Sequence, residues 1–268
     1  MSSKKKNNSD SFDAYYREQF PDCWDKLREA LLAPKQHYKC LSCGLTTPYY
    51  LDFASYEAAL ALTIEENDTV LDMCSAPGGK ALAIALLLKK NCKMICNEIS
   101  LSRRKRLEKV ISTIEDRDIA SCIKITPYDA TQFGLYRPCS FTKILLDAPC
   151  SSEAHVLSST HHYNIWSPHR IKMCAQKQFS LLASAYDALK AGGTIIYSTC
   201  ALLPSENDEV VKRLCKKRDG VTLDYFEEKE HQKAKNSFGY YTKHGIQIMP
   251  TLENRVGPIY YAKIQKSL

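Results

Sequence analysis

The sequence has no run of about 18 or more apolar residues, the length that a helix needs to cross a membrane, so we expect no membrane partner. Acidic residues are in the minority, with 30 Asp and Glu against 37 Lys and Arg and a formal charge of +7. This basic excess fits a nucleic-acid partner. A solvated basic face would give the same balance, and the sequence pI of about 8.7 lies below the value of about 9 typical of nucleic-acid-binding domains.

A disulfide framework is also missing, although the chain has 12 cysteines. Their spacing does not match a compact secreted scaffold, and no signal peptide precedes them. Cys92, Cys96 and Cys122 lie in apolar stretches, where thiols pack as small apolar groups. Cys40 and Cys43 form half of a zinc-binding pattern without a second pair, so we expect no metal site.

The beginning of the chain also lacks a targeting pattern. Residues 1–10 are rich in lysine and serine without the arginine-rich amphipathic character of a transit peptide, and we expect a disordered tail. Together with the cysteine usage, this favours the cytoplasm, with the mitochondrion as the alternative in a eukaryote. Residues 11–48 are predicted to form a helical N-terminal extension: two short helices broken at Pro21, then a connector over residues 34–50.

From residue 49 onward the pattern changes to alternating strands and helices. Strands are predicted at residues 70–73, 94–97, 123–125, 143–146 and 194–197. Helices are predicted at residues 80–89, 101–115, 171–189 and 206–217. Residues 147–170 are expected to be a long loop, and residues 259–264 an edge strand that an antiparallel orientation would suit. This alternation predicts an α/β fold with a doubly wound, mostly parallel, Rossmann-like sheet over residues 49–268.

A glycine turn follows the first of these strands. It matches neither G-x-G-x-x-G nor G-x-x-x-x-G-K-[ST], so a dinucleotide or phosphate site is not supported. Glycines let a ligand approach the backbone, and the carboxylate of S-adenosylmethionine would suit such a turn, although a purely structural turn is equally common. The residues concerned are Cys74, Ser75, Ala76, Pro77, Gly78, Gly79 and Lys80.

Carboxylates follow the next two strands. Glu98 stands about 20 residues past the glycines, where an open sheet presents an acid to ribose hydroxyls. Asp129 follows the third strand and could accept a hydrogen bond from an adenine amino group; the alternative is an Asx turn. Each signal is weak alone, but their order on successive strands favours an adenosyl-type ligand such as S-adenosylmethionine.

Two thiols follow the fourth and fifth strands. Cys150 ends the sequence Asp147-Ala148-Pro149-Cys150, and Cys200 ends Ser198-Thr199-Cys200. The carboxyl ends of neighbouring strands converge on the ligand crevice of an open sheet, so Asp147 and both thiols are expected to meet there. A lone buried cysteine is usually structural, but two at strand ends are hard to attribute to packing.

Paired thiols suit methylation at cytosine C5, which is too weakly nucleophilic to take a methyl group directly. A thiolate that adds to C6 makes C5 an enamine carbon, which can attack a sulfonium methyl. A base must then remove the C5 proton so that the first thiol can leave, and a second cysteine can assist. Asp147, if protonated or sharing a proton, could hydrogen-bond N3 of the base and stabilise the adduct. Methylation of an exocyclic amino group would need no covalent cysteine.

With Ala76-Pro77-Gly78-Gly79-Lys80, Asp147-Ala148-Pro149-Cys150 and Ser198-Thr199-Cys200, the chain resembles the NOP/Sun family of RNA 5-methylcytosine methyltransferases from about residue 49 onward. Further matching segments are Tyr49 to Ser55, Trp166, Gln178, Lys190 to Gly193, Glu206-Asn207 and Gly257 to Tyr260. The resemblance implies a seven-stranded methyltransferase sheet, S-adenosylmethionine as cofactor and RNA, either ribosomal or transfer, as substrate.

The resemblance also implies roles for single residues. Cys200 matches the family's nucleophile and Cys150 the cysteine that assists product release. The residues from Cys74 to Lys80, with Glu98, Asp129 and Asp147, match the cofactor shell. Arg103 matches a helix arginine near the cofactor, and Lys80 is also expected to approach the target base. DNA cytosine methyltransferases are similar in chemistry but place the nucleophile in the Pro-Cys motif.

The chain departs from many family members after Cys150, where Ser151 to His155 replace a Gly-x-Gly loop. This segment is closer to the branch typified by the mitochondrial members. A separate RNA-binding domain is not apparent, so a protein partner that supplies RNA targeting is a further expectation. Methylation of DNA or protein by the same core, and a non-enzymatic RNA-binding scaffold, remain as alternatives.

Some further residues are weaker candidates for RNA contact. His155, His161 and His162 lie in the predicted loop after Cys150, where histidines are usually solvated. Trp166 or Tyr163 could stack on a base. The basic clusters at residues 4–6, 103–106 and 216–218 could follow phosphates, although any one of them alone reads as a solvated face.

Overall fold

A computed structural model describes residues 8–223 and 239–268. Its main sheet contains nine strands in the order β5-β4-β3-β6-β7-β11-β10-β9, with β8 pairing to β11. The strands are β3 (Thr69–Asp72), β4 (Lys93–Asn97), β5 (Ile123–Thr126), β6 (Phe141–Asp147), β7 (Leu189–Thr199), β8 (Val221–Leu223), β9 (Gly239–Tyr241), β10 (Ile246–Ile248) and β11 (Ile259–Lys266). Strands β3 to β7 pair in parallel, whereas β8 to β11 pair antiparallel.

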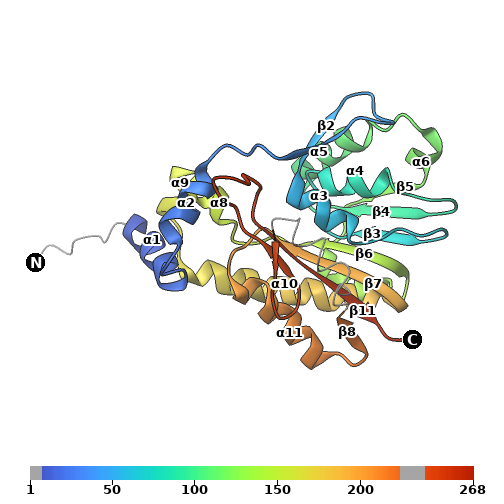
Figure 1. Cartoon of the computed structure of the whole chain (residues 1–268). Coiled ribbons are helices and arrows are strands. Elements are labelled where there is room, and N and C mark those ends of the chain that lie inside the picture. The colour runs from blue at the N-terminus through green and yellow to red at the C-terminus, as the bar shows by residue number, and fades with distance from the viewer. Residues whose placement is uncertain (1–7, 224–238) are drawn as a thin grey trace, which may run out of the picture.

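Helices cover both faces of this sheet (Figure 1). Neighbouring residues of one strand point to opposite faces, so Val70 joins the core under the first helix layer and Leu71 the core under the second. The first layer holds α3 (Phe53–Leu60), α4 (Gly79–Ala85) and α5 (Leu101–Ile111), and the second holds α7 (Phe133–Tyr136), α10 (Pro168–Ala188) and α11 (Asp208–Lys217). The predicted doubly wound, mostly parallel α/β fold is confirmed.

The N-terminal helices α1 (Asn8–Gln19) and α2 (Trp24–Leu32) pack against two short helices, α8 (Glu153–Leu157) and α9 (Thr160–Asn164), at one end of the molecule (Figure 1). Aromatic side chains form the core between them. The ring of Phe12 lies against those of Tyr16, Trp24 and Trp166, with centroids 4.6, 5.9 and 4.9 Å away. These helices therefore bury apolar surface against the segment that follows Cys150.

Several sequence predictions were wrong in detail. The sheet has nine described strands rather than seven, because the three-residue strands β8 and β9 extend it. Strand β11 is antiparallel as expected but is not an edge, because it lies between β7 and β10. The predicted loop over residues 147–170 contains α8 and α9. The predicted connector contains β1 (Tyr38–Leu41), which pairs with β2 (Tyr49–Asp52).

Helix ends also differ from the prediction. Helix α1 begins at Asn8, inside the predicted tail, while residues 1–7 of that tail lie outside the described residues. Helix α4 ends at Ala85, several residues early. Three further short elements complete the path: α6 (Arg117–Ser121), η1 (Ala130–Gln132) and η2 (Pro204–Glu206). In the described part of the chain, no helix is both long and apolar enough to cross a membrane.

Candidate active site

The two thiols meet at the carboxyl edge of the sheet. Asp147 at the end of β6 pairs in register with Ser198 near the end of β7. Cys150 and Cys200 therefore follow adjacent parallel strands by three residues and one residue. Their sulfur atoms are 2.8 Å apart, and both thiols are free and partly accessible. The structure thus brings together the two cysteines that the strand-end argument predicted to meet.

Their surroundings make the two thiols unequal. The pKa of Cys200 is lowered, first because the Cys150 thiol donates a hydrogen bond to it; burial opposes this effect, and a hydrogen bond from Ser152 adds to it. The pKa of Cys150 is raised well above its usual value by that same hydrogen bond, by burial and by the nearby charges of Cys200, Glu206 and Glu153. Cys200 is therefore the better thiolate, and Cys150 keeps its proton.

Lys80 and Asp147 form an ion pair beside the thiols. The Lys80 Nζ lies 2.9 Å from Asp147 Oδ2 and 3.3 Å from Ser55 Oγ. Ser198 Oγ donates to the other Asp147 oxygen at 2.9 Å. Burial alone would lower the pKa of Lys80, but the Asp147 carboxylate more than offsets it and the pKa is raised. Asp147 is thus held by Lys80 and Ser198, and its hydrogen bond to N3 of a base stays a prediction.

Buried polar side chains hold the two loops that carry Cys150 and Cys200, the Cys150 loop after β6 and the Cys200 loop after β7. Glu206 Oε2 accepts hydrogen bonds from the Ser151 backbone N–H at 2.9 Å and from Gln178 Nε2 at 2.8 Å. Gln178 Nε2 also reaches the Pro149 carbonyl at 3.0 Å. On the other loop, Asn207 bonds Thr199 Oγ1 and the Ala201 carbonyl, on either side of Cys200. Both strand ends are therefore fixed before any ligand arrives.

A cavity of about 280 Å³ lies next to these loops. Of the predicted cofactor shell, Cys74, Glu98, Arg103 and Asp129 line it; Ser75, Ala76, Pro77, Gly78, Gly79, Lys80 and Asp147 are not among its lining residues. Sequence reasoning missed Asn97, Ile99, Tyr128 and Lys177, which also line it, as does Pro149 beside Cys150. Their only sequence signal is that they neighbour the predicted acids and cysteines.

Glu98 and Arg103 connect this cavity to the glycine turn. Glu98 is buried, and its carboxylate accepts from the Ser100 backbone N–H at 2.8 Å and pairs with Arg103 at 3.3 Å. The Arg103 guanidinium also donates to the Ala76 carbonyl. Asn97 is also fixed by hydrogen bonds. Its amide bonds the Met73 and Tyr128 carbonyls and the Tyr128 N–H. The acid predicted for ribose hydroxyls is thus held in a fixed orientation.

The glycines of the turn serve packing. A Cβ on Gly79 would lie 2.7 Å from Leu51 and 3.0 Å from the Tyr49 hydroxyl. Gly78 has a φ of +121°, and a Cβ there would lie 3.0 Å from Val110. Side chains of β2 and α5 therefore pack directly against the turn. Packing thus requires both glycines, and their role in admitting a ligand stays a prediction.

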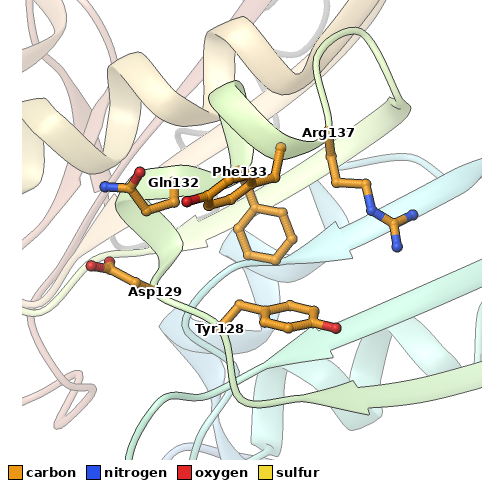
Figure 2. Close-up of a pocket in the computed structure, with 6 residues that line it drawn as sticks. Tyr128, Asp129, Gln132, Phe133 and Arg137 are labelled. Carbon is orange, nitrogen blue, oxygen red and sulfur yellow. The ribbon is translucent and has the colours of Figure 1, made fainter.

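Asp129 adopts the alternative that the sequence left open. Its side chain caps η1 by accepting from the Thr131 N–H and hydroxyl, as in an Asx turn. It also borders a second cavity of about 490 Å³, which shares Tyr128 and Asp129 with the first. In Figure 2 the rings of Tyr128 and Phe133 lie near each other in a T-shaped arrangement, with Asp129 and Arg137 on opposite sides. An aromatic hollow therefore adjoins the cofactor cavity.

Asp72 is a buried acid that sequence reasoning passed over. It ends β3, is 1% exposed, and neither carboxyl oxygen has a hydrogen-bond partner among the described residues. Burial and the nearby Asp147 charge raise the pKa of Asp72 to about 7. Its position inside the run from Val70 to Lys80 was its only sequence signal.

The weaker RNA-contact candidates fare differently. Trp166 cannot stack on a base, because it is 1% exposed inside the aromatic core; that expectation was wrong. Tyr163 donates its hydroxyl to Asp13 and packs on Phe12. His155, His161 and His162 cluster on α8 and α9, with ring centroids 4.5 and 5.5 Å apart. Cys40 and Cys43 are exposed, and no metal-binding group of three or more side chains occurs within residues 8–223 and 239–268.

Known proteins are similar to this chain in sequence. A mitochondrial tRNA (cytosine(34)-C(5))-methyltransferase of Danio rerio is 32% identical over 81% of this chain and 60% of its own. The ribosomal RNA small subunit methyltransferase F of Aliivibrio fischeri is 33% identical over 82% of this chain and 46% of its own. The chain thus spans about three-fifths or less of the length of these relatives.

Solved structures agree with the fold. PH0851 superimposes with a TM-score of 0.75 over 99% of this chain and 70% of its own, at 18% identity. NSun6 from Pyrococcus horikoshii, solved with SFG, superimposes with a TM-score of 0.65 over 84% of this chain and 54% of its own, at 25% identity. The family model for 16S rRNA methyltransferase RsmB/F matches residues 59–265. The chain therefore belongs to the RsmB/F family of RNA methyltransferases, as its resemblance to the NOP/Sun enzymes predicted.

Proposed function

We propose that this chain transfers a methyl group from S-adenosylmethionine to C5 of a cytosine in RNA, with Cys200 as the covalent nucleophile. The observation that carries the proposal is the 2.8 Å contact between Cys200 and Cys150 at the carboxyl ends of β6 and β7. The cavity beside it shares Pro149 with the Cys150 loop. Relatives named as tRNA and rRNA cytosine methyltransferases support the same reaction.

The cavity suits S-adenosylmethionine by its chemistry. Glu98 offers a fixed carboxylate for ribose hydroxyls, and Tyr128 offers an aromatic wall beside Asp129. Arg103, held on the Ala76 carbonyl, fixes Glu98 for this purpose. The bound cofactor supplies an electrophilic methyl group on a sulfonium.

The protein's own residues then act on the base. The Cys200 thiolate adds to C6, which turns C5 into the nucleophile that takes the methyl group. The C5 proton must next leave, after which the sulfur–C6 bond breaks and Cys200 regains its thiolate. Cys150 can accept this proton only as a thiolate, so its own proton must first pass to solvent; its raised pKa makes that thiolate a strong proton acceptor. Lys80, paired with Asp147, places a positive charge where electron density builds on the ring.

RNA binding finds support in a basic groove between α10 and α11. The groove encloses about 450 Å³, and its charged lining residues are Lys172, Glu209, Lys212, Arg213, Lys216 and Lys217. Glu209, its acidic member, pairs with Lys212 at 3.2 Å. Both helices begin on the thiol-bearing edge of the sheet, so the groove leads away from the reaction centre. A phosphate backbone that follows it would gain several ion pairs.

Attack at C6 needs the face of the ring, so the target cytosine must be unpaired or flipped out. We place it in a loop of ribosomal or transfer RNA. The names of two relatives include the mitochondrion, so that compartment stands beside the cytoplasm as the place of action. A protein partner that supplies RNA targeting is a further part of the proposal.

The test is to incubate the purified chain with methyl-labelled S-adenosylmethionine and total RNA, and to digest the product to nucleosides. We expect label in 5-methylcytidine. Label in another nucleoside would refute C5 chemistry. Label transferred only to DNA or to protein would support those alternatives. Retention of RNA without label would identify a binding scaffold.

A further inference from the structure

Glu153, three residues past Cys150, is fully buried at the start of α8. Its Oε1 atom accepts hydrogen bonds from the Tyr16 hydroxyl at 2.6 Å and from Ser151 Oγ at 3.2 Å. Its Oε2 atom accepts from the Leu202 backbone N–H at 3.3 Å. The three donors belong to helix α1, to the Cys150 loop and to the Cys200 loop.

This arrangement ties together parts that are far apart in sequence. Tyr16 lies 137 residues before Glu153, and Leu202 lies 49 residues after it. Helix α1 also precedes residues 59–265, the part that the family model matches. A buried carboxylate is unfavourable unless hydrogen-bond donors satisfy it. The burial of Glu153 is therefore compensated only when all three segments are in place.

We propose that Glu153 and Tyr16 are positioning residues for the thiol pair, with helix α1 acting through them to hold the two cysteine loops at contact distance. This inference rests on the proposed function, because the thiols are positioned for that reaction. Glu206 holds only the Cys150 side, through Ser151 and Gln178. Among the buried carboxylates described here, Glu153 is the one that bonds both the residue after Cys150 and the residue two past Cys200.

The consequence concerns the reactivity of Cys200. Its thiolate is favoured chiefly by the hydrogen bond from Cys150, which depends on the spacing of the two loops. The charge of Asp147 opposes the thiolate, and so does that of Glu153 where it is ionised, since burial raises the pKa of Glu153 to about 7. Glu206 faces Cys150, and Lys80 supplies the nearby positive charge. Releasing either loop therefore removes the main factor that activates the nucleophile.

The first test compares two tyrosine-to-phenylalanine variants. Tyr16→Phe removes only the hydroxyl that meets Glu153. Tyr186→Phe is the matched control, because Tyr186 is a buried residue of α10 whose hydroxyl donates to the Asp219 carbonyl after α11, away from both loops. We expect Tyr16→Phe to lower kcat about tenfold or more, with KM for S-adenosylmethionine within about twofold, because misplaced reacting groups slow chemistry steeply. Equal kcat values in the two variants would overturn the proposal.

The second test needs no methylation and so stands apart from the proposed function. The rate of Cys200 alkylation by iodoacetamide is followed from about pH 6 to about pH 9 by peptide mass spectrometry. We expect Tyr16→Phe and Glu153→Gln to move the profile to higher pH, with alkylation at neutral pH slowed about threefold or more, and Tyr186→Phe to leave it unchanged. Glu153→Gln is the sharper variant, because loss of its charge alone would move the profile to lower pH.

A profile that stays in place or moves to lower pH in Glu153→Gln would overturn the positioning role. If the wild-type chain methylated no cytosine while the alkylation profiles shifted as expected, the proposed function would fail and the positioning of the thiols would stand.

Discussion

Cys150 and Cys200 are the same side chain in two electrostatic environments. The hydrogen bond between the two thiols lowers the pKa of Cys200 and raises that of Cys150, which supports Cys200 as the proposed nucleophile. Burial raises the pKa of Cys74 and Cys96, which also lie near strand ends. Position at a strand end therefore does not by itself make a cysteine reactive.

Substitution of Glu98 tests the proposed cofactor site. Its carboxylate is buried and fixed by Ser100 and Arg103, so Glu98→Ala should weaken S-adenosylmethionine binding by about 1–3 kcal/mol, the cost of a lost charged hydrogen bond. Calorimetry measures the affinity. Glu108→Ala, which removes an exposed acid of α5, is the control. Equal affinity in the two variants would remove Glu98 from the site.

Asp72 predicts a pH dependence of stability. Its pKa is about 7 in the folded protein and about 4 when unfolded, so between these values the folded state holds a proton that the unfolded state has lost. Stability contributed by Asp72 therefore falls as pH rises through this window and is level above it. Asp72→Asn should gain stability relative to wild type between about pH 4.5 and pH 8 in urea unfolding. Urea midpoints of the wild type and Asp72→Asn that change in parallel with pH would contradict the raised pKa of Asp72.

At the scale of elements, the N-terminal helices share one aromatic core with α8 and α9. Phe12→Ala should cost about 3–5 kcal/mol, the usual cost of removing a buried aromatic ring. Leu32→Ala on α2 is the control, because that side chain is exposed. Urea unfolding followed by circular dichroism should show one transition. A separate early transition in Phe12→Ala would mean that α1 and α2 fold apart from the sheet.

The sequence predicts elements well where a long apolar run sits beside a turn. Strands β3, β4, β6 and β7 are found within a few residues of their ends, and their parallel order places Asp147, Cys150 and Cys200 at one edge. Strands β1, β8 and β9 are three or four residues long and owe their existence to pairing with distant partners. Local pattern carries no information about such pairing.

The same limit applies to the site. The strand-end acids and thiols were visible in the sequence because they follow apolar strands. Glu153 and Tyr16 were not, because their contact spans 137 residues and joins two helices outside any motif. Trp166 was misread for a related reason, since only the packed structure places its ring inside the aromatic core. Tertiary contacts, rather than spacing, decide these roles.

At the scale of the whole molecule, charge is distributed over more than one surface. Lys216→Ala combined with Lys217→Ala removes two cations from the groove between α10 and α11. We expect weaker RNA binding and a slope of log K against log salt reduced by up to about 2. The control combines Lys93→Ala with Lys124→Ala, in a hollow near the amino ends of β3 and β4. Equal slopes in the two double variants would exclude the groove as an RNA path.

The most direct test of the account follows a covalent complex between RNA and each cysteine variant on a denaturing gel. Cys200→Ala cannot form the sulfur–C6 bond, so it should be inactive and leave no retarded band. Cys150→Ala should still attack and accept the methyl group but stall before release, so a retarded RNA–protein band should accumulate. A band with Cys200→Ala and none with Cys150→Ala would reverse the two roles, and full activity in both variants would contradict covalent catalysis by this pair.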